Sequence, residues 1–398
     1  MKNFSFTLYL EINNLSYIFF VIENNEPGNF KILYKLELPL KGIENNKIID
    51  LEEVSGVIKK NIYIIEQKLN HTFKEIVLIL DNFEFTFVNL SGFKKLNGSQ
   101  VLRENITYIL NTLKVYVDEI EFKKKVLHIF NTKFYLDNKK IDNLPIGLFG
   151  DFYSHELSFT LINSNDYKNL KSIFEKCNLN IKKIFIKSFI EGANISENHK
   201  NIETFFQITI KEDKTTIFYF ENNSLKYEQT FKFGSDIIIK DISKITSLKT
   251  DNIKEILSKI KLEQNISEDQ LVEEKFFVDS SYRKIKKKLI YEIVHARIKE
   301  ISELVLFKNV NLKYYNKISK VIFLKIENKI QDKSLNEIFK KVFSINSDLD
   351  INFLEPLSSE SMMKTANNLV HFGWKKEAIP VLQVKKSLIA RFFDKLFS

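Results

Sequence analysis

The hydrophobic and polar positions of the first 80 residues change from strand-like to helix-like spacing and back. Apolar stretches separated by Asn-Asn and Pro-Gly breaks predict strands at Phe4–Leu10, Tyr17–Ile22 and Phe30–Leu38. Apolar residues then recur at helical spacing over Leu51–Leu69, which predicts a helix. The continuous apolar run Ile76–Leu80 is typical of a strand inside a sheet. Strand, helix and strand in this order indicate an α/β layer.

The pattern changes between Phe83 and Phe159, where strand-like alternation surrounds a short helix. We predict a helix over Val101–Leu113 and strands over Val126–Phe130 and Leu157–Leu161, which indicate a small inserted α+β subdomain. The later predicted elements are helices at Tyr167–Cys177 and Ser334–Phe343, a charged helical region at Asp251–Leu306, and strands at Ile181–Phe189, Thr204–Ile210, Thr215–Phe220 and Lys320–Leu324. The order of elements therefore occurs twice, as in a duplicated α/β fold.

The last twelve residues, from Ser387 to Ser398, predict an amphipathic helix. At about 100° per residue, large apolar side chains gather on one half of the helix and Arg391 lies opposite, with Lys395 nearby. The apolar face consists of Leu388, Ile389, Phe392, Phe393, Leu396 and Phe397. Such a helix can dock on its own domain, but its place after the polar stretch Lys375–Lys386 favours an interfacial membrane anchor.

The composition narrows the class of protein. With 398 residues, the chain exceeds the roughly 250–300 at which single cores stop growing, so we expect two or more domains. Its single cysteine, Cys177, fits a reducing compartment, and no apolar run approaches the ~20 residues of a membrane-spanning helix. The net charge of +9 suits an anionic surface, either lipid or nucleic acid. The six histidines lack metal-ligand spacing, so we expect no metal site.

Several stretches of the chain, in the right order, resemble segments of the bacterial cell-division protein FtsA. They are Val126–Ile129 with Asp142–Gly150, then Leu170–Ile181, Gly234–Ile242, Glu292–Ile301 and the terminal amphipathic helix. The resemblance implies an α/β fold of the actin-like type. This is a duplicated ribonuclease-H-like fold, here with an inserted small α+β subdomain.

The resemblance also suggests how the chain is divided. Residues 1–82 and 162–203 form the first actin-like subdomain, and residues 83–161 form the inserted one. The second core subdomain takes 204–233 and 312–374, with a partner-binding subdomain at 234–311 between its two parts. A linker at 375–386 leads to the membrane-targeting helix at 387–398.

FtsA proteins bind ATP through glycine-rich loops, and this chain lacks the corresponding glycines. The first phosphate loop corresponds to Glu11–Leu15, the second to Thr209–Ile217, and the adenosine loop to the region around Ile326–Asn328. Glycines let such loops present backbone N–H groups to phosphate. The degenerate positions are Glu11, Asn13, Asn14, Thr209, Lys211, Glu212 and Asp213. We therefore expect no catalytic residue, no cofactor and no ATP hydrolysis; the alternative is an active actin-like ATPase with unusual loops.

By resemblance, the helix Lys286–Leu306 belongs to the subdomain that receives the acidic and hydrophobic C-terminal peptide of the tubulin-like protein FtsZ. The partner-binding candidates are Arg283, Lys287, Arg297 and Glu300, of which the basic residues would pair with peptide carboxylates. The default explanation for any one of these charges is a solvated helix face.

The function that the resemblance implies is a non-enzymatic adaptor. It would self-associate into filaments, tether FtsZ to an anionic membrane surface on the cytoplasmic side at the division site, and contact later division proteins. A scaffold for type IV pilus assembly shares the fold and is a further alternative. A nucleic-acid binder is suggested only by the charge, and we expect no nucleic-acid partner.

Overall fold

The computed structural model describes residues 5–26, 29–81, 83–260, 262, 265–277, 281–315, 318–327, 333–345 and 349–378. The chain divides into two compact units. Unit 1 takes Met1–Asn194, Asn222–Lys226 and Ser359–Ser398, and unit 2 takes Ile195–Glu221 and Tyr227–Ser358.

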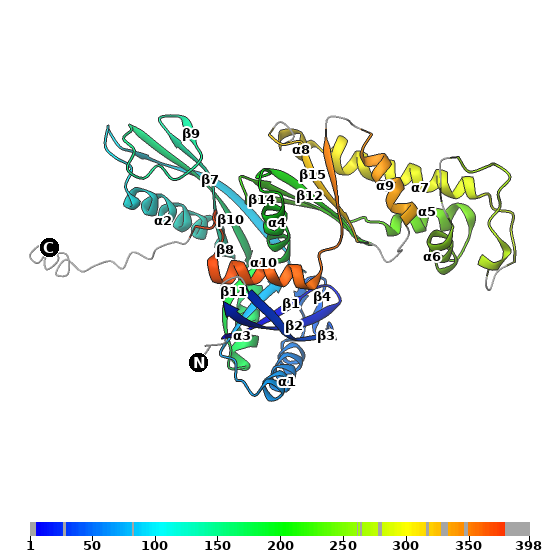
Figure 1. Cartoon of the computed structure of the whole chain (residues 1–398), viewed down its shortest axis with the longest axis horizontal. Helices are drawn as coiled ribbons and strands as arrows, with labels where there is room; N and C mark the ends of the chain where they lie inside the picture. The colour runs from blue at the N-terminus through cyan, green and yellow to red at the C-terminus, as the bar shows by residue number, and fades with distance from the viewer. Residues whose placement is uncertain are drawn as a thin grey trace, which may run out of the picture. The chain divides into compact units, whose positions relative to one another are not determined.

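The main sheet of unit 1 has the strand order β11-β6-β1-β2-β3 (Figure 1). Its strands are β1 (Ser5–Ile12), β2 (Ser16–Glu26), β3 (Asn29–Pro39), β6 (Glu75–Leu80) and β11 (Asn180–Ile186). A small hairpin, β4 (Ile43–Glu44) with β5 (Lys47–Ile48), precedes helix α1 (Leu51–Leu69). β1, β6 and β11 are parallel, whereas β2 and β3 are antiparallel neighbours, so hairpins form one side of the sheet and crossovers the other.

Helices cover both faces of this sheet. α1 and α3 (Ser164–Lys176) pack on one face, where Leu10 of β1, Ile58 of α1 and Ile173 of α3 share a core. On the other face, the Tyr9 hydroxyl donates a 2.8 Å hydrogen bond to Asn367 of α10 (Ser359–Phe372). α4 (Lys187–Asn198) follows β11 directly. Strands that are buried on both faces explain the continuous apolar runs in the sequence.

The boundaries of α1 match the sequence prediction because its caps are local. The side chain of Asp50 accepts a hydrogen bond from the Glu53 N–H at 2.9 Å, which caps the first turn. Asn70 ends the helix in the left-handed conformation (φ 47°).

A second, antiparallel sheet of unit 1 is inserted between β6 and α3, with the order β7-β10-β8-β9. Its strands are β7 (Phe85–Lys95), β8 (Lys124–Leu136), β9 (Lys139–Ile141) and β10 (Phe152–Asn163). α2 (Arg103–Ile120) covers one face, where Leu110 and Val117 pack against Ile129 and Phe159. This sheet and its covering helix confirm that a small α+β subdomain is inserted between β6 and α3.

The main sheet of unit 2 has the order β14-β13-β12-β15-β16. Its strands are β12 (Phe205–Ile210), β13 (Thr215–Glu221), β14 (Ser224–Phe231), β15 (Val321–Ile326) and β16 (Asp350–Leu354). Its helices are α5 (Asp236–Thr246), α6 (Thr250–Lys259), α7 (Lys287–Ser302), α8 (Val310–Tyr315) and α9 (Lys333–Phe343), with short helical turns at Glu274–Phe276 and Glu303–Phe307. Read from the hairpin side, this order repeats that of the main sheet in unit 1, so the predicted duplication is confirmed.

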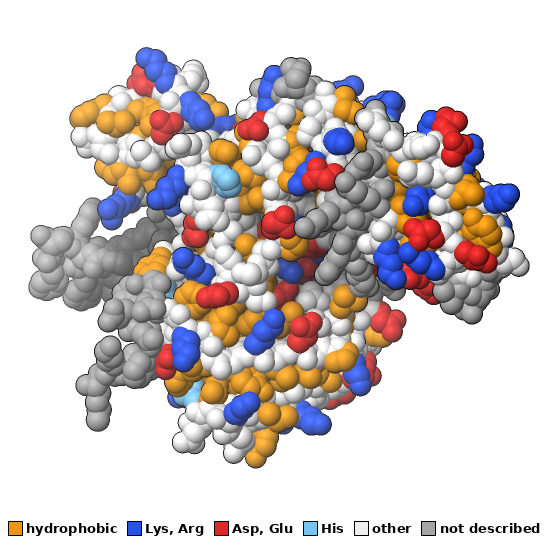
Figure 2. Space-filling view, turned by 45° about the vertical axis from the view of Figure 1, so that its right-hand side comes forward, with side chains coloured by type: hydrophobic (Ala, Val, Ile, Leu, Met, Phe, Trp, Pro, Cys, Tyr) orange, Lys and Arg blue, Asp and Glu red, His pale blue; other side chains and the backbone are white. Residues whose placement is uncertain are grey.

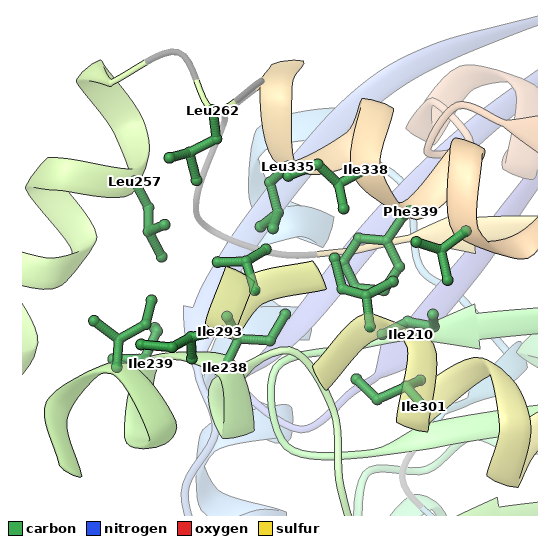
Figure 3. Packing of buried hydrophobic residues seen from close by; sticks show 14 of the residues in the cluster. Ile210, Ile238, Ile239, Leu257, Leu262, Ile293, Ile301, Leu335, Ile338 and Phe339 are labelled. Carbon is green, nitrogen blue, oxygen red and sulfur yellow. The ribbon is translucent and has the colours of Figure 1, made fainter. Parts of the chain in front are cut away.

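Side chains from four helices and a strand converge in the core of unit 2. Figure 3 shows Ile238 of α5, Leu257 of α6 and Ile293 of α7 in this cluster, with Ile210 of β12 and Phe339 of α9. Short isolated helices are marginally stable in water, so these helices depend on packing against elements that are far apart in sequence.

Some predicted boundaries are wrong. The strand expected at Ile181–Phe189 ends at Ile186, and α4 begins at Lys187. The helical region expected at Asp251–Leu306 is interrupted, because α6 ends at Lys259 and α7 starts at Lys287. The sequence prediction also missed α5 and α10.

Candidate functional site

The position of the first phosphate loop lies at the end of β1 in unit 1, and Glu11 is held there by a lysine. Glu11 is only 2% exposed, and its carboxylate accepts a 2.8 Å hydrogen bond from the Lys187 ammonium. The carboxylate of Asp81, after β6, lies 3.6 Å from the same nitrogen. Burial lowers the pKa of Lys187, but Asp81, Glu11 and Glu191 together raise it by more, so the net shift is upward. The ammonium is therefore the counter-ion of this acidic group.

The turn after β1 uses its own N–H groups. The Asn13 side-chain oxygen accepts hydrogen bonds from the N–H of Leu15 at 2.9 Å and of Ser16 at 2.8 Å. The Ser16 hydroxyl donates to Glu37 at 3.0 Å, and Asn14 is exposed at the tip of the turn. The amide groups that a glycine-rich loop would offer to phosphate thus bond to a side chain of the same turn.

The position of the second phosphate loop is a tight hairpin between β12 and β13 in unit 2. The Lys211 N–H donates to the Lys214 carbonyl at 2.9 Å and closes the turn. Thr209 is buried on β12, whereas Asp213 is exposed and Glu212 is half-buried. Near the adenosine-loop position, Glu327 forms a 2.8 Å ion pair with Lys325 and lies 4.0 Å from the Lys211 ammonium. Charged side chains therefore occupy this region.

The start of α5 packs directly on this hairpin. The N–H groups of Ser235 and Asp236 donate to the carbonyls of Lys211 and Glu212, each at 2.9 Å. A Cβ atom on Gly234 would lie 2.1 Å from the Lys211 oxygen, so only glycine fits. Amides at a helix start, which often bind anions, are here bonded to the hairpin backbone.

Two of the four predicted partner-binding residues pair with each other within unit 2. Arg297 of α7 donates to Asp241 of α5 and to Glu300 on its own helix, and the bond to Asp241 is the main reason that the pKa of Arg297 is raised. Lys287 lies 3.8 Å from Glu273. The bond to Asp241 joins α5 to α7, and Arg297 has intramolecular partners on both helices.

Arg283 lies on a basic and apolar surface at the end of α5. Its guanidinium donates to the Thr246 carbonyl at 3.4 Å, next to the exposed side chains of Lys244, Ile245 and Lys249. Sequence reasoning missed these residues because it predicted no helix there. The spacing of the isoleucines after Asp236 is the signal that would have revealed α5.

The predicted membrane-binding residues lie outside the described residues. They are Leu388, Ile389, Arg391, Phe392, Phe393, Lys395, Leu396 and Phe397. Among the helices of the described ranges, none combines the length and the apolar character that crossing a bilayer requires.

The segment that leads to this tail, Trp374–Ala378, is bound to unit 1; we call it the C-terminal strap. Glu377 bridges antiparallel to Phe130 of β8, and the Ala378 N–H donates to the Ile129 carbonyl at 2.7 Å. The Trp374 indole N–H donates to the Asn223 carbonyl at 2.8 Å. The linker was expected to start at Lys375, but the structure holds the chain against β8 as far as Ala378, because the strap adds backbone hydrogen bonds to a strand.

The Glu377 carboxylate joins the strap to two basic side chains. It bonds to the His128 ring at 2.9 Å and to the Lys183 ammonium at 2.7 Å. Burial alone would raise the pKa of Glu377, but the bonds and charges of His128 and Lys183 lower it to about 2. Within the described part of the chain, no group of three or more His, Cys, Asp or Glu side chains has the arrangement of a metal site.

Comparison with known proteins agrees with this architecture. No family model matches the chain. It is 21% identical to the cell-division protein FtsA of Buchnera aphidicola subsp. Schizaphis graminum, over 99% of this chain and 97% of that protein. It is 20% identical to FtsA of Neisseria meningitidis serogroup B, over 75% and 72% of the two chains. The solved PilM-PilN type IV pilus biogenesis complex matches with a TM-score of 0.54 at 10% identity, over 92% of this chain and 98% of that one.

The pilus protein shares the fold. The Buchnera protein is similar in sequence over almost the whole of both chains, and the Neisseria protein over about three quarters of each. The structure contains the duplicated sheets and the subdomain inserted after β6 that the sequence resemblance implied. The chain is a divergent homologue of the FtsA cell-division proteins, with an actin-like fold.

Proposed function

We propose that this protein is a cell-division scaffold that attaches FtsZ filaments to the cytoplasmic face of the membrane without hydrolysing ATP. Its similarity to FtsA proteins over almost the whole chain supports the role in division. We infer the absence of ATP hydrolysis mainly from one observation. At both phosphate-loop positions, backbone N–H groups already donate hydrogen bonds to other groups of the chain.

The loops do not suit a nucleotide for two physical reasons. A phosphate at the first loop would have to break the bonds of Leu15 and Ser16 to Asn13, each of which contributes about 0.5–1.5 kcal/mol. A metal ion at Glu11 would have to displace the Lys187 ammonium, because like charges repel at short range. We therefore assign no catalytic residue and no cofactor.

The surface around Arg283 is our candidate site for the C-terminal peptide of FtsZ. Lys244 and Lys249 add positive charge, while Ile245 (58% exposed) and Tyr282 (40% exposed) add apolar area. This combination suits an acidic peptide with hydrophobic residues. Arg297 would support the site by joining α7 to Asp241 of α5 rather than by contacting the peptide, and Glu300 would hold the Arg297 side chain.

Attachment to the membrane would come from the amphipathic segment at Leu388–Phe397, and self-association would strengthen it. One short helix gives reversible binding to anionic lipid, and several copies in a filament bind through avidity. Hydrophobic side chains are exposed on the inserted part of unit 1 (Figure 2), and two of them, Leu148 and Phe149, are available to other copies or to later division proteins.

Flotation with anionic vesicles tests the proposal. The full chain should float and should bring the FtsZ C-terminal peptide with it. Phe393→Glu, on the apolar face, should abolish flotation, whereas Ser398→Glu adds the same charge on the opposite face and should not. Flotation that is unchanged by Phe393→Glu would contradict the membrane role.

Calorimetric titration with Mg-ATP separates the scaffold from an active ATPase, since the scaffold should give no saturable heat up to millimolar nucleotide. The likeness to the PilM-PilN complex concerns the fold alone, so we do not favour pilus assembly. Binding of nucleic acid would show as an affinity that falls steeply with salt and survives deletion of residues 387–398.

A further inference from the structure

The end of α2 exposes apolar and basic side chains at the end of the inserted subdomain toward which the C-terminal strap runs. Helix α2 ends at Ile120, and a turn leads to the start of β8; we call Ile120–Lys125 the α2–β8 turn. Phe122 is 72% exposed and Ile120 is 48% exposed. An aromatic side chain this exposed on a tight turn loses the stabilisation that burial would give it.

Positive charge surrounds Phe122. Lys123 and Lys125 are exposed, and the Lys123 ammonium lies 5.6 Å from the centre of the Phe122 ring. Glu121 is paired with Lys124 at 2.8 Å, and the exposed Glu119 is outnumbered by the two exposed lysines. An aromatic residue flanked by lysines matches the interface of an anionic bilayer, where the ring enters the headgroup region and the ammonium groups stay among the phosphates.

The C-terminal strap points toward this turn. Because it runs antiparallel to β8, the chain at Ala378 is directed from Ile129 toward Lys124, about 17 Å away at strand rise. Ala378 also packs in the cluster that contains Leu110 and Val117 of α2, so the strap lies beside this helix (Figure 1). The nine residues that follow Ala378, up to and including Ser387, can span about 30 Å at most. An anchored tail therefore keeps Ala378 within about 30 Å of the membrane, and the α2–β8 turn lies about 17 Å from Ala378 in the direction in which the strap runs.

We propose that the α2–β8 turn is a second membrane contact, in which Phe122 enters the interface of an anionic bilayer next to the anchored tail. This proposal rests on the membrane attachment proposed above. With two contacts, unit 1 has a fixed orientation on the membrane. A single contact through the tail would let unit 1 rotate relative to the membrane plane. The inserted subdomain then lies with the start of β8 toward the lipid.

Quenching by brominated lipid tests the contact in the full chain. The variant Phe122→Trp adds an indole to the turn, and the wild-type chain, with Trp374 as its single tryptophan, gives the background signal. Phe93→Trp is the matched control, since Phe93 is 71% exposed on β7. Phe93 pairs with Ser154 of β10, nine residues from Asn163, which pairs with Lys124, so the two sites lie about 30 Å apart along the sheet.

The expected result is strong quenching of the added tryptophan at position 122 and none at position 93 when the chain is bound to anionic vesicles. In a separate titration, Phe122→Ser should weaken vesicle affinity about fivefold, and Phe93→Ser should leave it unchanged. Vesicle binding without quenching at position 122 would overturn this proposal and leave the proposed function standing. If the full chain does not bind vesicles, both fall together.

A third outcome identifies the competing occupant. The emission maximum of the tryptophan at position 122 can also be measured without vesicles. If it lies at a shorter wavelength than that of an exposed tryptophan, and this shift disappears when residues 387–398 are deleted, the tail covers the turn in solution. That shift, together with an absence of quenching on vesicles, would overturn the proposal and identify the tail, not lipid, as the partner of this surface.

Discussion

The ammonium group of Lys187, at the first residue of α4, lies 2.8 Å from a carboxylate oxygen of Glu11 at the end of β1. The two residues are 176 positions apart in sequence, and both side chains are largely shielded from water. A buried carboxylate needs a positive partner to remain charged. In this chain the partner is a lysine side chain of the protein itself.

Replacing Lys187 should therefore be costly. Lys187→Met leaves Glu11 and Asp81 without their shared cation, and we expect a loss of about 3–5 kcal/mol in the free energy of unfolding, measured with urea. Lys182→Met is the control, since Lys182 is paired with Glu75 on the surface and should contribute at most about 1 kcal/mol. The double variant with Glu11→Gln should recover part of the loss. Equal effects of the two single variants would contradict this account.

The strap should respond to acid. The pKa of Glu377 is about 2 in the folded chain against an ordinary value of 4.5, so its stabilising effect is complete above pH 4.5 and is lost as the pH falls toward 2. The difference corresponds to about 3 kcal/mol. Trp374, the single tryptophan, reports release of the strap by fluorescence.

Glu377→Gln provides the comparison for this pH effect. The variant should release the strap more easily at pH 7 and should approach the wild-type chain as the pH falls to 2 and below, because the Glu377 carboxylate is half protonated at its pKa and becomes neutral below it. A wild-type strap that is equally stable at pH 5 and pH 2.5 would show that Glu377 does not hold it.

Gly234 should be irreplaceable for steric reasons. The Cβ atom of Gly234→Ala would lie 2.1 Å from the Lys211 oxygen and would push α5 away from the hairpin, at a cost of about 3 kcal/mol or more. Gly56 lies in the middle turns of α1, where an added Cβ atom would meet no other atom within 4 Å. Gly56→Ala should therefore stabilise the chain by about 0.5–1 kcal/mol. Thermal unfolding of both variants measures the contrast, and a neutral Gly234→Ala would disprove the close packing.

The two arginines of the partner-binding region should behave differently. Arg283→Glu should weaken binding of the FtsZ C-terminal peptide about tenfold, because it reverses a charge on the exposed surface at the end of α5. Arg297→Gln should lower stability by breaking the link to Asp241 and change peptide affinity less.

Fluorescence anisotropy with labelled peptide measures both effects. Lys60→Glu on α1 makes the same change in net charge in unit 1 and should leave peptide binding intact. A stronger effect of Arg297→Gln than of Arg283→Glu would move the site from the end of α5 to α7.

The sequence by itself determined the elements whose signals are local. Helix α1 runs from Leu51 to Leu69 as predicted, because its apolar spacing and both caps lie within that segment. The buried strand β6 was visible because both faces of the sheet are covered, which leaves a continuous apolar run. The repeated order of such elements was enough to indicate the duplicated fold.

Only the tertiary structure decided which distant side chains meet. Glu11 was predicted as a degenerate loop residue, but its pairing with Lys187 depends on β1 and β11 ending at the same edge of a parallel sheet. The placement of Gly234 on Lys211 and of Glu377 between His128 and Lys183 depends likewise on how separate elements pack. Periodicity reports the environment of each position along the chain, whereas ion pairs and close backbone contacts depend on distances through space.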